Sequence, residues 1–169
     1  MDTQLHRVEN LAGAFSVAVT DRVNAAAEDI VGMGGEAPAA IIQIGTMPGL
    51  TITTLGTALG LTHSATVRVV AKLELHKLVR KARGDDAREV RVTLSPTGER
   101  MMKKLLAARD TALHKILKPL VLADRIELER LLELVLRRVP MDEDEAFRIC
   151  RMCDESCCPQ DSCPVTTYA

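Results

Sequence analysis

The chain has 169 residues, 47% hydrophobic and 27% charged, which is enough apolar material for one folded core and excludes a disordered tail protein. Its 22 Lys and Arg residues nearly balance its 23 Asp and Glu residues, so the net charge of -1 does not by itself indicate a nucleic-acid partner. Aromatic residues make up only 2% of the chain. RNA-binding modules that stack bases on flat side chains are therefore excluded, and we expect no RNA partner.

The sequence also lacks signals for a membrane or for secretion. It contains no run of about 18 apolar residues, and its first residues are not the basic and then apolar pattern of a signal peptide. These observations predict a cytoplasmic protein without a membrane partner. In a reducing compartment, clustered cysteines are more often a metal or redox site than a disulfide framework. All five cysteines lie between Cys150 and Cys163.

The first part of the chain is predicted to be helical. Apolar residues recur at helical spacing over residues 5–31, which predicts one long amphipathic helix that ends in the glycine-containing segment 32–35. A short apolar helix is expected within residues 38–47, because Pro48 and Gly49 favour a turn directly after it.

Two short helices joined by a tight turn are expected next. Residues 51–60 begin with a threonine that can cap a helix and end with Gly60, which can adopt a positive φ. Thr62 can cap a second helix. The apolar stripe of that helix is formed by Thr66, Val69, Val70 and Leu73. Two helices separated by a short glycine-containing turn form a helix-turn-helix.

A β-hairpin is predicted directly behind this motif. Val90, Val92 and Leu94 alternate with charged residues, and they follow a polar, glycine-containing turn at residues 83–88. The pattern indicates two strands. A hairpin in this position is the wing of a winged-helix domain.

Two long helices are predicted after the hairpin. The first runs from Pro96, in its first turn, through Lys118. The second runs from Asp124 to Val139 and opens with a pair similar to a capping box, Asp124 and Glu127. These helices are more apolar than a small domain needs. They either complete one globular core or, as we predict, form a dimer interface with the N-terminal helix.

Several segments follow one pattern in chain order. They are Leu50-Thr51, residues 55–62, residues 69–74, Leu78-Val79, residues 86–88 and residues 92–98. This pattern resembles the multiple antibiotic resistance regulator (MarR) family of winged-helix transcription factors over about residues 5–139. Its most specific part is a helix-turn-helix, then Asp-x-Arg in the wing, then Leu-Ser-Pro-x-Gly at the start of a long helix.

The resemblance implies a mainly α-helical fold. A winged helix-turn-helix at residues 36–98 would lie between dimerisation helices at 1–35 and 99–139, followed by a cysteine-rich tail at 140–169. The resemblance also implies a homodimer on pseudo-palindromic double-stranded DNA, with the second helix of each motif in the major groove and a wing arginine in the minor groove. Charge agrees with this assignment, because residues 62–91 hold eight Lys and Arg against four Asp and Glu, a net charge of +4.

The predicted DNA-contacting residues lie on both helices of the motif and in the wing. The set is Thr53, Thr54, His63, Ser64, Val67, Arg68, Lys72, Arg83, Asp86 and Arg88. His63, Ser64 and Arg68 are expected near base edges. Lys72 and either Thr53 or Thr54 are expected near phosphates. Arg88 is expected in the wing, held by Asp86. The simpler alternatives are a solvated His63, an exposed helix lysine and a surface ion pair in the wing.

The tail differs from the family pattern and carries all the cysteines. Residues 140–169 hold seven Asp and Glu against two Arg, a net charge of -5, so DNA is not the expected partner of the tail. Thiolates spaced so closely can wrap one metal, because a C-x2-C turn aims both sulfurs at a common point. We predict that the ligands are Cys150, Cys153, Cys158 and Cys163, with Cys157 as a possible substitute for Cys158.

Three interpretations of the cysteines stay open. Four-thiolate chemistry favours zinc, in a structural or sensing site, whereas the compact run followed by Cys-Pro is similar to iron-sulfur loops. The third is metal-free thiol redox switching, for which Arg148 and Arg151 are the only cations nearby in the sequence. Either metal would tie the tail to the dimer core and transmit metal or redox status to the spacing of the two recognition helices.

The sequence shows no sign of an enzyme. It lacks a nucleophile elbow, a phosphate-binding loop and a His-x3-His zinc pair, so we expect no catalytic activity. Two alternatives to a metal-responsive regulator stay open. One is a repressor that responds to an unidentified small molecule and has a purely structural zinc tail. The other is a thiol-redox or electron-transfer protein, against which tight sequence-specific DNA binding would discriminate.

Overall fold

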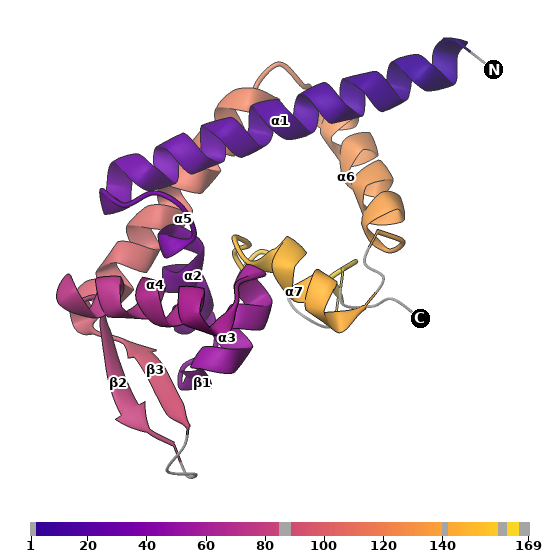
Figure 1. The fold of residues 1–169 in the computed structure, drawn as a ribbon. Helices are drawn as coiled ribbons and strands as arrows, with labels where there is room; N and C mark the ends of the chain where they lie inside the picture. Colours follow the sequence, from indigo (N-terminus) through magenta and orange to yellow (C-terminus); the bar gives the residue numbers. More distant parts are fainter. Residues whose placement is uncertain (1–2, 85–88, 140–141, 159–161, 166–169) are drawn as a thin grey trace.

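The computed structural model describes residues 3–84, 89–139, 142–158 and 162–165, with side chains described from residue 6 onward. In these ranges the chain is mainly α-helical with a small sheet, as predicted (Figure 1). The elements are α1 (Thr3–Val31), α2 (Ala37–Thr46), β1 (Leu50–Thr51), α3 (Ile52–Leu59), α4 (His63–Leu75), β2 (Val79–Arg83), β3 (Val90–Leu94), α5 (Pro96–Leu117), α6 (Leu122–Leu136) and α7 (Glu143–Cys150). No helix in the described ranges is long and apolar enough to cross a membrane.

Side-chain caps set the beginnings of three helices. Thr51, Thr62 and Ser95 precede α3, α4 and α5, and each hydroxyl oxygen accepts a hydrogen bond from the backbone N–H three residues later. Gly60 ends α3 with a φ of 65°, a conformation that other residues rarely adopt. The helix-turn-helix predicted from these residues is therefore confirmed.

The sheet has one strand more than the predicted hairpin. β2 and β3 pair antiparallel, with Val79 opposite Leu94 and Lys81 opposite Val92. β1 pairs with the other edge of β3, which gives the order β1-β3-β2. Sequence patterning could not show β1, because a strand of two residues is too short for apolar alternation.

The main core lies around α2 and is covered by both helices of the motif, the sheet and α5. Ile41, Ile42 and Ile44 of α2 are fully buried, as are Leu55 of α3 and Val92 of β3. Dense packing of this kind resists deformation. The winged-helix part, which comprises α2 to β3, is therefore a rigid platform for the exposed face of α4.

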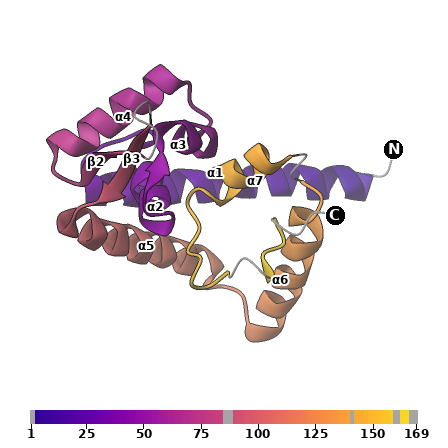
Figure 2. The ribbon, with the colours of Figure 1, turned by 90° about the horizontal axis from the view of Figure 1, so that it is seen from below.

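The helices outside this platform are less covered. α1 packs along α5, but α6 has no buried residue, and Figures 1 and 2 show α6 standing apart from the winged-helix part. The predicted start of α6 at Asp124 is wrong. The helix begins at Leu122, because the Asp124 carboxylate reaches back to accept from the N–H of Val121, and Glu127 instead pairs with Arg130.

The tail begins with a helix that the sequence analysis did not predict. Asp142 caps α7, and its carboxylate accepts a hydrogen bond from the N–H of Glu145 at 2.7 Å. Three acidic residues in the first turn favour the helix electrostatically. The helix packs against α3 of the winged-helix part, so the tail is a packed element and not only a cysteine-bearing loop.

Candidate nucleic-acid interface and cysteine cluster

Helix α4 divides into a buried face and an exposed face. Thr66, Val70 and Leu73 are fully buried toward the core. The residues predicted to contact DNA lie on the exposed face, namely His63, Ser64, Val67, Arg68 and Lys72. Among the described residues, no ion pair joins Arg68 or Lys72 to a carboxylate. These two charges are therefore available to an external anion.

Close packing fixes α4 against α3. A methyl group on Gly56 would lie 2.9 Å from the Thr66 hydroxyl oxygen, so only glycine lets the two helices approach this closely. That hydroxyl donates to the Thr62 carbonyl oxygen at 2.9 Å, which satisfies a buried polar group. The exposed face of α4 is thus held in a defined orientation relative to α3.

The threonines predicted near phosphates are exposed at the beginning of α3. Thr53 lines a groove together with His63, so the structure brings these two predicted residues to one surface. The Thr54 hydroxyl lies 3.0 Å from that of Thr51. Thr53 therefore presents its hydroxyl group beside His63 of α4, as a phosphate contact requires, whereas the Thr54 hydroxyl is engaged with Thr51.

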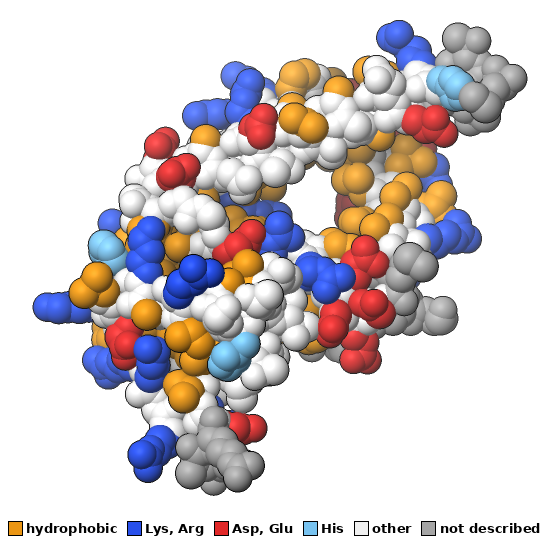
Figure 3. Space-filling view, in the orientation of Figure 1, with side chains coloured by type: hydrophobic (Ala, Val, Ile, Leu, Met, Phe, Trp, Pro, Cys, Tyr) orange, Lys and Arg blue, Asp and Glu red, His pale blue; other side chains and the backbone are white. Residues whose placement is uncertain are grey.

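The wing contributes further cations. Arg83 is exposed at the end of β2, whereas Asp86 and Arg88 lie outside the described residues. Lys81 is neutralised by Glu74, with 2.6 Å between the ammonium and carboxylate groups. Figure 3 shows Lys and Arg side chains over the winged-helix end and Asp and Glu side chains grouped on the α7 side.

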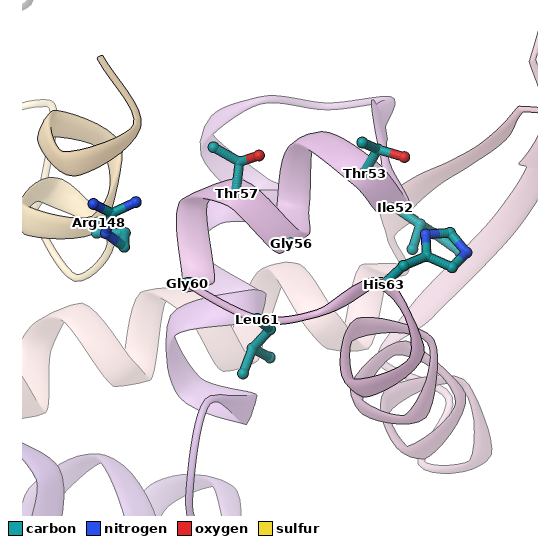
Figure 4. A pocket seen from close by; sticks show the side chains of 8 residues that line it. All are labelled: Ile52, Thr53, Gly56, Thr57, Gly60, Leu61, His63 and Arg148. Carbon is teal, nitrogen blue, oxygen red and sulfur yellow. The ribbon is translucent and has the colours of Figure 1, made fainter. Parts of the chain in front are cut away.

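The groove that holds Thr53 and His63 continues along α3 to the tail. Its volume is about 380 Å³, and its far end is formed by Arg148 of α7 (Figure 4). A Cβ on Gly60 would lie 3.0 Å from Cδ of Arg148, so glycine at this position makes room for the arginine as well as ending α3. The sequence analysis missed Arg148 as a member of this surface.

The tail is also attached to α2. The Arg151 guanidinium lies 3.5 Å from the Glu36 carboxylate at the start of α2, and it donates to the Arg148 carbonyl oxygen at 2.6 Å. Met152 packs against the main core. These contacts hold the C-terminal end of α7 beside the winged-helix part.

Four cysteines of the tail interact with one another. Cys150 is a hydrogen-bond partner of Cys153 and Cys163, and Cys163 is also a partner of Cys158. Cys157 is exposed and interacts instead with Asp154, 3.9 Å from its carboxylate. The structure therefore brings together the four residues that the sequence analysis chose as ligands and leaves out the one chosen as a substitute.

Mutual contact changes the acidity of these thiols. The hydrogen bond between Cys150 and Cys153 raises the pKa of Cys150, and it lowers the pKa of Cys153 to about 7. Burial is the main cause that raises the pKa of Cys158 to about 11. The cation that lowers the pKa of Cys153 is Arg109 of α5, so the expectation that only Arg148 and Arg151 lie near the thiols is wrong. An arginine 44 positions earlier cannot be assigned to this site from sequence spacing.

The cysteines lie against a small second core. Cys163, Ala146 and Val165 are buried there, and Leu136 of α6 and Ile149 pack against them. Within the described part of the chain, no three His, Cys, Asp or Glu side chains are already arranged to hold a metal ion. The donor set itself has the chemistry of a thiolate metal site, because four cysteines that interact with one another come from one short segment.

Comparisons with known proteins agree with the winged-helix geometry. Residues 31–89 match the sequence model of the MarR family. This segment is a MarR-family domain. The comparison with curated protein sequences finds no match for the chain.

Solved structures extend the similarity beyond the MarR-family domain. RV1404 from Mycobacterium tuberculosis is similar with a TM-score of 0.71 at 18% identity, over 82% of this chain and 95% of that one. The MarR family protein Rv2887 from the same organism, solved in complex with DNA, gives 0.63 at 22% identity, over 75% and 95%. FabT from Streptococcus pneumoniae, also in complex with DNA, gives 0.61 at 18% identity, over 79% and 94%. These matches establish a shared fold.

The MarR-family domain and the tail differ in how well the sequence revealed them. The domain carries threonine caps and a left-handed glycine, and β3 directly after it carries an apolar alternation, each of which is a local signal. A signal for α7 was also present, because Asp142 and Glu145 have the spacing of a helix N-terminus and Ala146, Ile149 and Cys150 have helical spacing. The contact of α7 with the MarR-family domain had no signal in the sequence.

Proposed function

We propose that this protein is a dimeric, sequence-specific DNA-binding transcriptional regulator with a metal site in its C-terminal tail. The observation that carries DNA binding is the exposed face of α4, where Arg68 and Lys72 have no carboxylate partner among the described residues. Relatives with the same fold have been solved in complex with DNA. Charge, exposure and fold thus support one function.

In this proposal α4 enters the major groove. Arg68 donates two hydrogen bonds to a guanine, and the first turn of α4 lies near neighbouring base edges. Lys72, Thr53 and Thr54 contact phosphates and fix the register of the helix on DNA. Arg83 extends the basic surface into the wing.

Homodimer formation is supported by apolar surface that the single chain leaves exposed. On α6, Leu131, Leu132 and Val135 are all more than two-fifths exposed. Phe15 and Leu11 of α1 are exposed as well, and Figure 3 shows an opening between α1 and α6. Apolar area of this kind marks an interface, and a second copy of the chain with the same helices would cover it.

The cysteines are proposed to bind zinc or an iron-sulfur cluster. Cys150, Cys153, Cys158 and Cys163 would be the ligands, because they interact with one another while Cys157 turns to Asp154. A zinc ion would cross-link the tail, and a cluster would add a redox state. Metal or redox status would then act on the adjacent MarR-family domain.

The first test of DNA binding is selection from a random DNA library by the purified protein. We expect enrichment of an inverted repeat whose half-sites are about 34–36 Å apart, one helical turn or a multiple of it. A library that shows no enrichment over the input would overturn the proposed function.

The first test of the tail is elemental analysis of protein purified without oxygen. Zinc near one per chain without sulfide indicates a zinc site, and iron with acid-labile sulfide indicates a cluster. Cys150→Ser is expected to lose the metal and Cys157→Ser to retain it. Protein that contains neither metal nor sulfide, or equal loss in both variants, would contradict the proposed ligands.

A further inference from the structure

The groove along α3 has the chemistry of an oxyanion site. Its polar lining consists of the Thr53 and Thr57 hydroxyls, the His63 imidazole and the Arg148 guanidinium, and none of its lining residues is acidic (Figure 4). We propose that Arg148 binds a DNA backbone phosphate in this groove, so that the tail extends the DNA-binding surface. This inference rests on the proposed function.

Arg148 is held in place but keeps its charge free. Its stem lies against Gly60, and its carbonyl oxygen accepts a hydrogen bond from Arg151. Within the described ranges no carboxylate pairs with its guanidinium, whereas the neighbouring Arg151 pairs with Glu36. A positioned arginine without a partner is suited to bidentate binding of a phosphate.

The position of the groove favours DNA over a small solute. His63 and Thr53 at one end are residues predicted to face DNA, and Arg148 lies at the other end of α3 (Figure 4). An eight-residue helix spans about 12 Å, so the groove follows a length of backbone and is not a compact cage for one small ion. The groove is also continuous with the exposed face of α4. A DNA strand that meets α4 would therefore pass along it.

This contact would also allow a tail that is acidic overall to lie against DNA. The net charge of the tail is -5, and four of its seven acidic residues, at positions 142–145, precede Arg148 at the beginning of α7. Among the described residues of the tail, Arg148 alone lines the groove. The proposal thus concerns one side chain and not the tail as a whole.

The test is the salt dependence of operator binding by the full-length, metal-loaded protein. Each phosphate contact contributes about 0.9 to the slope of log K against log salt concentration, so Arg148→Gln is expected to reduce the slope of a dimer by about 1.8. The preferred DNA sequence should stay unchanged, because a phosphate contact does not read bases. Arg148→Lys is expected to recover most of the slope.

The matched control is Arg130→Gln, which removes the same charge from α6, where Arg130 pairs with exposed Glu127. It should leave the slope unchanged, and equal loss in both variants would mean that net charge alone is responsible.

If Arg148→Gln leaves slope and affinity unchanged while wild-type protein still selects an operator, the inference is wrong and the proposed function stands. Calorimetric binding of inorganic phosphate that Arg148→Gln abolishes, with no change in the DNA slope, would assign the groove to a small anion and overturn the proposal. Wild-type protein that selects no operator would overturn both.

Discussion

At the scale of single residues, the proposed DNA complex separates base reading from phosphate binding on the exposed face of α4. Arg68 and Lys72 lie four positions apart, one helical turn, and both are exposed. An arginine can make two hydrogen bonds to a guanine, whereas a lysine near a phosphate acts as a point charge. Replacing Arg68 and replacing Lys72 are therefore expected to have different effects on DNA binding.

We predict that Arg68→Ala relaxes sequence preference at one position of each half-site. Loss of a bidentate guanine contact costs about 1–3 kcal/mol of discrimination against the wrong base. Lys72→Ala should instead weaken binding to all sequences by a similar factor. Both are measured by competition among single-base variants of the selected operator. An unchanged Arg68→Ala profile would remove this residue from the base-reading set.

The surroundings of a single residue could be predicted from the sequence only where its neighbours in the structure are also close in the sequence. Spacing alone led us to choose Cys157 as the substitute ligand, and in the structure Cys157 is exposed while the other four cysteines interact with one another. The sequence could not place Arg109 beside the cysteines or Arg148 in the groove along α3. Their positions depend on how α5 and α7 pack, and no local pattern encodes that packing.

At the scale of elements, the junction between the sheet and α5 shows why a local motif has its composition. Ser95 caps α5 and donates its side-chain hydroxyl to the Lys77 carbonyl oxygen at 2.6 Å. The N–H of Ser95 donates to the Leu78 carbonyl oxygen at 2.9 Å. Gly98 lies directly over that carbonyl group, where a Cβ would collide with the oxygen. The Leu-Ser-Pro-x-Gly sequence thus lets a helix begin against a strand.

We predict that Gly98→Ala destabilises the fold. The added methyl group meets backbone atoms, which cannot rotate away, and overpacking of this kind costs about 1–3 kcal/mol of the free energy of unfolding. Urea unfolding at a fixed protein concentration measures the loss. Thr97→Ala, at the exposed neighbouring position, is the control and should change stability by less than about 0.5 kcal/mol. Equal stability of Gly98→Ala and wild type would mean that α5 shifts freely at its start.

Element prediction succeeded where each end had its own chemical signal and failed where it did not. Threonine caps located α3 and α4, and a proline in the first turn located α5. β1 is too short to show a pattern, and α6 begins two residues early because Asp124 acts from inside the helix. These errors reflect backbone pairing and reach-back hydrogen bonds that a search for preceding caps does not detect.

At the scale of the whole molecule, α6 carries exposed apolar side chains that the proposed dimer would cover. Its Leu132 and Val135 side chains are exposed, and apolar surface of this kind is stabilised when it is removed from water. Leu132→Glu is predicted to shift the dimer toward monomer, because a charge would be buried without a partner. Sedimentation measures the shift, with Glu129→Gln on the same helix as the control. A dimer that survives Leu132→Glu, Val135→Glu and their combination would place the interface elsewhere.

The tail links the two ends of the molecule, and that link determines what metal binding can do. One side of it touches α3 through Arg148 and α2 through Arg151, and the other touches α6 through Leu136. Cys150 is the last residue of α7, two positions after Arg148. Loss of the metal would therefore release the helix that carries the proposed phosphate contact.

We predict that removing the metal lowers operator affinity in wild-type protein and has much less effect in Arg148→Gln. If the metal acts by positioning Arg148, the two changes remove the same interaction and cannot add. The measurement is a double cycle of operator affinity, with and without metal, in the wild type and the variant. Circular dichroism must show that the stripped protein stays folded.

Additive losses would mean that metal acts by another route, such as the spacing of the two recognition helices. Equal affinity of folded protein with and without metal would leave the site a structural role.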